Sequence, residues 1–112
     1  EDMIMELEIQ TQGEHTIILP RGEIDFHSSP RLREQMLSVL DSGRDLLVDM
    51  SEVSFIDSSA IASLVEGLQH ARNKGRELAL ASIQETPMKV LQLTRLDSVF
   101  PIHESINACL KN

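Results

Sequence analysis

The chain has 112 residues, which is enough for one compact domain but too few to fill two separate hydrophobic cores. Its formal net charge of −8 argues against nucleic acid and anionic membranes as partners, because both carry negative charge themselves. Cys109 is the only cysteine, which excludes an internal disulfide and a cysteine-rich metal site. We therefore expect a single domain over residues 1–112, monomeric and without cofactor or metal, in which Cys109 is a small buried apolar residue.

The start of the chain predicts a protein that is not exported. Glu1 and Asp2 stand where a signal peptide has basic residues, and no apolar run approaches the roughly 20 residues that span a bilayer. A single cysteine also suits a reducing compartment. We expect a cytoplasmic protein, and we expect that the printed sequence lacks the native start because it begins with Glu1.

The first part of the chain predicts a hairpin followed by a helix. Apolar and polar residues alternate over 3–9, a turn is expected at 12–14, and an apolar run follows at 16–19, which together indicate an antiparallel hairpin. The segment 22–25 is then expected to leave the sheet. Ser29 followed by Pro30 is typical of a helix start, and Gly43 is typical of a helix end.

The rest of the chain alternates between strand-like and helix-like segments. Short apolar runs predict strands at 46–48, 53–56 and 77–81, and helical spacing predicts a helix from Ile61 to Ala71 that ends at Gly75. Thr86 and Pro87 predict another helix start, and Ile106 and Leu110 a last helix. Because helices separate the strands, parallel crossover connections are favoured. The expected fold is α/β, with a mixed sheet made of an N-terminal antiparallel hairpin and parallel strands, covered by about four helices.

Asp57, Ser58 and Ser59 are the most informative polar residues of the sequence. They lie between an apolar run and an amphipathic helix, where free backbone amides and the positive end of the helix dipole favour an anion. Two interpretations are open at this point. Asp57 or Ser58 caps the helix and does nothing more, which is common for these residue types, or the position accepts a phosphate.

A longer stretch of sequence favours the phosphate. The string SEVSFIDSSA, over 51–60, resembles the signature of STAS-domain anti-sigma factor antagonists, in which a hydrophobic pair, Asp, Ser, Ser or Thr, and Gly open the second helix. The string GEID, over 22–25, resembles the Gly-Glu-Leu-Asp segment of the same family. The order of elements matches over nearly the whole chain, so the resemblance implies a STAS-type fold.

The resemblance also implies a partner-switching cycle. The unphosphorylated protein would bind a serine-protein kinase that has a GHKL-type ATPase fold and doubles as an anti-sigma factor. That kinase would phosphorylate Ser58 and so end the binding, while the next hydroxyl residue, Ser59, is normally not modified. A PP2C-type phosphatase would reset the switch. The chain would therefore be a substrate and a ligand, and not an enzyme.

The expected partner-binding residues lie in the two matching segments. They are Glu23, Asp25, Asp57, Ser58, Ser59 and Ala60. We expect Asp57 to hold the helix start and to help align the Ser58 hydroxyl. Glu23 and Asp25 are expected on a neighbouring loop, where a solvated turn is the alternative interpretation. The family usually has Gly where this chain has Ala60, so we expect its methyl group to affect how closely a partner approaches.

Two other functions fit parts of the sequence. A hydrolase could pair Ser58 with one of the four histidines, but no Gly-x-Ser-x-Gly turn is present and the histidines are scattered. A STAS binding module that is never phosphorylated would instead serve as a sensory domain, a transporter tail or a subunit of a lipid-transport complex. The intact run of Asp57, Ser58 and Ser59 favours the phosphorylation switch.

Overall fold

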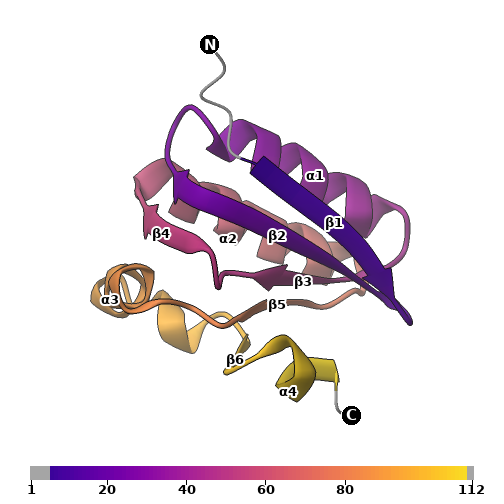
Figure 1. The fold of residues 1–112 in the computed structure, drawn as a ribbon. Helices are drawn as coiled ribbons and strands as arrows, with labels where there is room; N and C mark the ends of the chain where they lie inside the picture. The colour runs from indigo at the N-terminus through magenta and orange to yellow at the C-terminus, as the bar shows by residue number, and fades with distance from the viewer. Residues whose placement is uncertain (1–5, 111–112) are drawn as a thin grey trace.

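The computed structural model describes residues 6–110, which form a six-stranded mixed sheet with helices packed on it (Figure 1). The strands are β1 (Glu6–Gln12), β2 (His15–Ile24), β3 (Asp45–Asp49), β4 (Val53–Ile56), β5 (Leu78–Ala81) and β6 (Ile102–His103). The helices are α1 (Ser29–Asp41), α2 (Ser58–Lys74), α3 (Glu85–Leu93) and α4 (Ile106–Leu110), with a short 3-10 helix η1 over Leu96–Ser98. Over these residues the structure confirms the predicted α/β fold.

β1 and β2 form the predicted antiparallel hairpin. The register pairs Glu6 with Arg21 and Gln12 with His15, so the turn consists of residues 13–14. Gly13 has a φ of 62°, a left-handed conformation that glycine adopts without steric cost. The predicted alternation at residues 3–5 lies outside the described residues.

β2 continues past the point at which the sequence predicted that the chain leaves the sheet. It runs parallel to β3 over His15–Ile18 and then, after a register shift between Gly22 and Glu23, parallel to β4 over Gly22–Ile24. The prediction was wrong because such an irregularity lets one strand change its neighbour without ending. As a result Ile24 pairs with Ile56, and the ends of β2 and β4 lie side by side.

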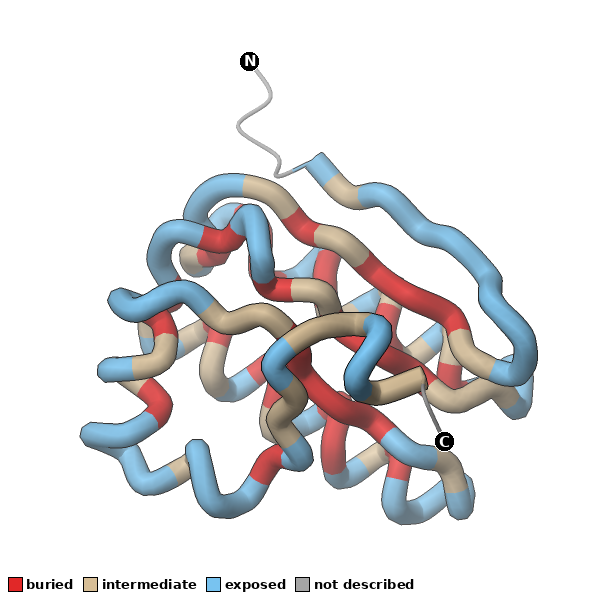
Figure 2. Tube along the Cα trace, turned by 60° about the horizontal axis from the view of Figure 1, so that its bottom comes forward, coloured by how far each residue is buried: buried red, intermediate tan, exposed pale blue. Residues whose placement is uncertain are grey.

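Parallel crossovers through α1, α2 and α3 connect the strands that follow the hairpin, as the alternation predicted. Successive strand residues face opposite sides of the sheet. One set packs against α1 and α2, and includes Ile18, Val48 and Leu80; the other set includes Ile17, Leu47 and Ala79, against which residues of α4 pack. Buried residues accordingly follow the central strands (Figure 2). None of the helices within residues 6–110 is long and apolar enough to cross a membrane.

The helix ends follow the sequence signals closely but not everywhere. α2 ends with Gly75 in the left-handed conformation, as predicted. α1 begins at Ser29, and the residue before the helix is Ser28, whereas the sequence predicted Ser29 in that place. The Ser28 hydroxyl makes no bond to the helix and instead accepts from the loop amide of Asp25 at 3.0 Å. α3 begins two residues before Pro87, since the first turn of a helix tolerates proline.

The packing of α2 on the sheet gives a first prediction. Leu64 is fully buried, so Leu64→Ala should lower the free energy of unfolding by about 2–5 kcal/mol through lost burial and a residual cavity. Leu93→Ala is the matched control, because Leu93 is 85% exposed and should change stability by less than about 0.5 kcal/mol. Urea unfolding followed by circular dichroism measures both. Equal losses in the two variants would contradict this description of the core.

Candidate functional site

Asp57 closes the N-terminal end of α2. Its backbone is extended, and its Oδ1 accepts hydrogen bonds from the amide of Ala60 at 3.0 Å and from the hydroxyl of Ser59 at 2.7 Å. The Asp57 amide donates to the carbonyl of Ile24 at 3.2 Å, which joins the helix start to the end of β2. The predicted cap is therefore Asp57.

The surroundings of Asp57 favour its ionised form. Partial burial by itself would raise its pKa, but hydrogen bonds from the Ser59 hydroxyl and from the backbone amides of Ala60, Ser59 and Phe26 outweigh this effect. The pKa of Asp57 therefore lies below its ordinary value. A negative charge at this end of α2 also interacts favourably with the helix dipole.

Ser58 is the first residue of α2, and it is exposed. Its hydroxyl has no hydrogen-bond partner within residues 6–110, and the bonds that Asp57 accepts come from Ser59 and Ala60. Any help that Asp57 gives in aligning the Ser58 hydroxyl therefore comes from holding the helix start and not from a direct hydrogen bond. Ser58 presents an unengaged hydroxyl to an incoming molecule.

Ser59 differs from its neighbour because it is held between the two helix starts. Its hydroxyl donates to Asp57 and accepts from the hydroxyl of Ser29, at 3.2 Å. Ser29 belongs to α1 and is 4% exposed, and its carbonyl accepts from the Ser63 hydroxyl of α2 at 3.5 Å. Two adjacent serines thus have opposite environments, one open and one enclosed.

Ala60 does not contribute to the contact surface, in contrast to the prediction. The residue is fully buried and belongs to the hydrophobic core between the sheet and the helices. Its methyl group points away from any partner because the third residue of α2 already faces the core. A methyl group at this position therefore affects stability rather than the approach of a partner.

The two acidic residues of the GEID segment lie next to the helix start but in different settings. Glu23 is exposed on β2, and not on a loop as predicted, with Phe55 as its register partner on β4. Asp25 lies in the loop after β2, where its Oδ1 accepts from the amides of His27 at 3.0 Å and Ser28 at 3.3 Å. The structure therefore places both acids near the end of β2, and Asp25 also orders the loop.

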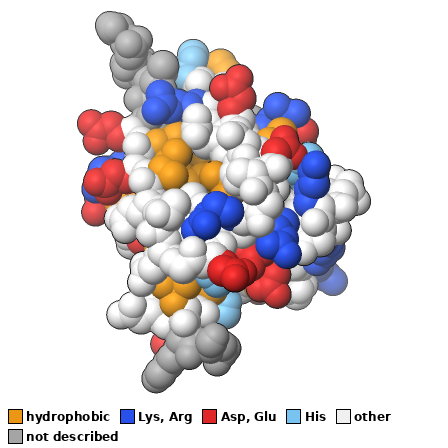
Figure 3. All heavy atoms as spheres, turned by 90° about the vertical axis from the view of Figure 1, so that its right-hand side faces the viewer, with side chains coloured by type: hydrophobic (Ala, Val, Ile, Leu, Met, Phe, Trp, Pro, Cys, Tyr) orange, Lys and Arg blue, Asp and Glu red, His pale blue; other side chains and the backbone are white. Residues whose placement is uncertain are grey.

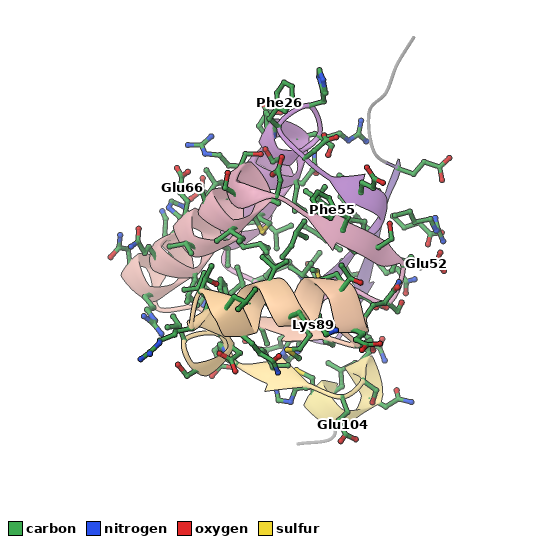
Figure 4. The ribbon with its side chains drawn as sticks, turned by 90° about the vertical axis from the view of Figure 1, so that its left-hand side faces the viewer. Phe26, Glu52, Phe55, Glu66, Lys89 and Glu104 are labelled. Atoms are coloured by element: carbon green, nitrogen blue, oxygen red, sulfur yellow. The ribbon has the colours of Figure 1, made fainter. Side chains whose placement is uncertain are left out.

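Two residues that the sequence analysis did not single out stand out at this end of the molecule. Phe26 is 66% exposed and Phe55 is 40% exposed, and both lie near the start of α2 (Figure 4). The sequence held one signal for Phe26: the chain has only three aromatic residues, and this one lies between two polar residues, as an exposed residue often does.

The described residues do not support a hydrolase site, a metal site or a reactive thiol. His70 bonds to Asp41 at 2.7 Å rather than to Ser58, and no histidine in the described part of the chain bonds to the Ser58 hydroxyl. Residues 6–110 contain no group of three or more His, Cys, Asp or Glu residues that could hold a metal ion. Burial, with Glu77 nearby, raises the pKa of Cys109 and so keeps its thiol protonated.

The fold and the site together define a small α/β domain that presents one unengaged serine at a helix start. The family model described as "STAS domain" matches residues 6–109, so the chain belongs to the STAS domain family. The chain is 30% identical, over 72% of its length and 74% of the relative's, to the anti-sigma-B factor antagonist of Bacillus subtilis (strain 168). Anti-sigma factor antagonists are regulators, in agreement with the expectation that this chain is not an enzyme.

Solved structures share the fold of this chain. An anti-sigma factor antagonist from Mycobacterium paratuberculosis has a TM-score of 0.86 at 19% identity, with 96% of this chain and 92% of that chain covered. The Bacillus cell fate determinant SpoIIAA in its phosphorylated form has a TM-score of 0.73 at 19% identity, with 96% of each chain covered. These similarities confirm the predicted STAS-type fold.

The buried position of Ala60 gives a second prediction. Ala60→Gly should lower the free energy of unfolding by about 1–2 kcal/mol, because glycine is a poorer helix former and a buried methyl group is lost. Ala62→Gly on the exposed side of α2 is the control, and should lose only the helix-propensity part. Urea unfolding compares the two. A smaller loss for Ala60→Gly than for Ala62→Gly would contradict the burial.

The lowered pKa of Asp57 gives a third prediction. A carboxyl group whose pKa is lower in the folded state stabilises the fold above its unfolded pKa, and this contribution is lost as the pH falls through the folded pKa. Asp57→Asn keeps an oxygen acceptor but does not titrate. The advantage of the wild type over Asp57→Asn should be full above about pH 5 and shrink below about pH 4. Urea unfolding at several pH values measures it, and an advantage that grows on acidification would contradict the prediction.

Proposed function

We propose that this chain is a cytoplasmic anti-sigma factor antagonist that is switched off by phosphorylation of Ser58. Its unphosphorylated form binds a serine kinase of the GHKL-type ATPase fold that doubles as an anti-sigma factor. The observation that carries the proposal is the contrast between the unengaged hydroxyl of Ser58 and the enclosed hydroxyl of Ser59. It rests further on the family, in which a relative is named as an anti-sigma-B factor antagonist.

The environment of Ser58 fits a phosphate acceptor. In the transfer, the Ser58 oxygen attacks the γ-phosphorus of ATP, the bond to the leaving ADP oxygen breaks, and the hydroxyl proton passes to a base. No group of residues 6–110 bonds to this hydroxyl, so the kinase supplies the base. The reverse step, hydrolysis of the phosphoserine by a PP2C-type phosphatase, restores the hydroxyl.

Phosphorylation ends binding through charge and desolvation. A phosphate adds about −1.5 to −2 charges at neutral pH, next to the ionised Asp57. In the kinase complex the phosphate on Ser58 would also lie against the phosphates of the bound nucleotide, since the Ser58 hydroxyl must reach the nucleotide for transfer. Each ~1.4 kcal/mol of repulsion or lost solvation weakens binding tenfold, so a local effect suffices. The positive end of the helix dipole at the start of α2 offsets part of the added charge, although the Ala60 amide is already bonded to Asp57.

The proposal predicts where phosphate appears. After incubation with ATP, Mg²⁺ and a lysate of the source cells, mass spectrometry should find one added phosphate on Ser58. Ser59→Ala, the matched control, should still be modified, and Ser58→Ala should not. Phosphate on Ser59 in the wild type would contradict the proposal. No phosphate, in a lysate that modifies a control substrate of this kinase class, would favour a constitutive STAS binding module.

The proposal also predicts the binding of two Ser58 variants. Ser58→Ala should bind the kinase as tightly as the wild type, because it removes only a hydroxyl. Ser58→Asp should bind at least about tenfold more weakly, because it adds a charge at the contact surface. Isothermal titration with the purified kinase measures both affinities, and circular dichroism checks that both variants are folded. Wild-type affinity of Ser58→Asp would contradict the electrostatic mechanism.

A further inference from the structure

The aromatic residues of this chain are distributed in an unusual way. The sequence contains three Phe and no Trp or Tyr. Phe100 is 4% exposed and lies in the core, but Phe26 and Phe55 are 66% and 40% exposed. A protein that has few large aromatic side chains thus leaves most of them outside its core. Exposed apolar side chains that gather in one place mark contact surfaces.

The two exposed phenylalanines come from different segments that lie side by side at the end of the sheet. Phe55 lies on β4, three residues before Ser58, and pairs in register with Glu23. Phe26 follows Asp25 in the loop after β2, two residues beyond Ile24, whose carbonyl accepts from the Asp57 amide. Viewed from the left-hand side of Figure 1, both labelled side chains lie near the start of α2 (Figure 4). Any partner that reaches the Ser58 hydroxyl therefore approaches these rings.

Three acidic residues lie near the rings. Glu23, Asp25 and Asp57 carry negative charge, and within residues 6–110 none of them has a Lys, Arg or His within ion-pair distance, whereas Arg21 pairs with Glu8 and Glu52. A surface with unpaired carboxylates is complementary to one that carries Arg or Lys.

The opposite end of the molecule has a different character. There Lys and Arg side chains lie beside Asp and Glu side chains (Figure 3), as in the pairs Lys74 with Asp41 at 3.4 Å and Arg76 with Asp45 at 3.8 Å. Several of the charges at that end are paired within the chain. What distinguishes the Ser58 end is that two exposed rings lie beside carboxylates that form no ion pair within residues 6–110.

From these observations we infer that Phe26 and Phe55 anchor the kinase partner through apolar contacts, and that the kinase surface is apolar opposite these rings and basic around them. The inference rests on the proposed function and identifies the side chains that supply the affinity of this chain for the kinase. Aromatic side chains that become buried at the centre of an interface commonly dominate its binding energy. The two rings then supply the binding energy, and phosphorylation of Ser58, which lies near them, opposes it.

The test uses the kinase that transfers phosphate to Ser58, purified from source cells by that activity. Phe26→Ala and Phe55→Ala should each weaken its binding by roughly 10- to 100-fold. The matched control is Ile9→Ala, because Ile9 is 47% exposed but pairs with Ile18, six residues before the end of β2 and so roughly 20 Å away. It should bind like the wild type. All three side chains are at least 40% exposed, so each variant should remain folded, and circular dichroism checks this.

The outcomes separate the inference from the proposed function. If both Phe variants bind like the wild type while Ser58 is still phosphorylated, the inference fails and the proposed function stands. If both lose affinity and yet are phosphorylated at Ser58 when the kinase concentration exceeds the weakened dissociation constant, the inference holds. If no activity phosphorylates Ser58, both fail.

A second copy of the chain is the competing occupant of this surface. Sedimentation of the wild type at high concentration tests it. We expect a monomer, because carboxylates of one sign on both copies would repel each other. A dimer that Phe26→Ala or Phe55→Ala dissociates would overturn the assignment of these rings to a kinase.

Discussion

The rest of the site depends on the hydrogen bonds of Asp57. Its amide is bonded to the end of β2, and its carboxylate is bonded to the first turn of α2 and to the Ser59 hydroxyl. A single residue thus fixes the helix start relative to the strand. The Ser58 hydroxyl next to it takes no part in these bonds and has no partner in the described part of the chain.

The same bonds explain how two adjacent serines acquire different accessibility. Ser59 lies on the side of α2 that faces α1, where Ser29 and Asp57 satisfy its hydroxyl. Ser58 lies one residue earlier, which turns its side chain about 100° around the helix axis and into solvent. Under the proposed function, the fold itself would therefore select between the two hydroxyls, because it presents only that of Ser58 to a kinase.

Much of the fold followed from the sequence because it depends on local patterns. Alternation, apolar runs and helical spacing located the strands and helices, and Gly75 marked the end of α2. The change of neighbour along β2 was not predictable, because pairing between Ile24 and Ile56 depends on where a distant strand lies. The start of α1 is a different case, because the bonds between Asp25 and Ser28 join residues only three apart; the predicted helix start was one residue late although these contacts are local.

In the site, too, local features were predictable and features that depend on tertiary packing were not. The cap at Asp57 and the exposed Ser58 follow from residue types at a helix start. The burial of Ala60 and the enclosure of Ser59 follow from the packing of α2 on the sheet and on α1, which spacing alone did not resolve. Exposure of Phe55 is a tertiary property too, since a phenylalanine in a short apolar run is more often part of the core, whereas Phe26 lies between two polar residues.

The measurement that tests the central claim most directly compares the kinase affinity of the protein phosphorylated on Ser58 with that of the unphosphorylated protein, alongside the thermal unfolding of both forms. The account predicts that phosphorylation weakens binding by at least about tenfold, while the thermal midpoint stays within about 2 °C. Equal affinity of the two forms would contradict the account. A phosphorylated form that has unfolded would contradict it as well, because the lost affinity would then come from lost structure.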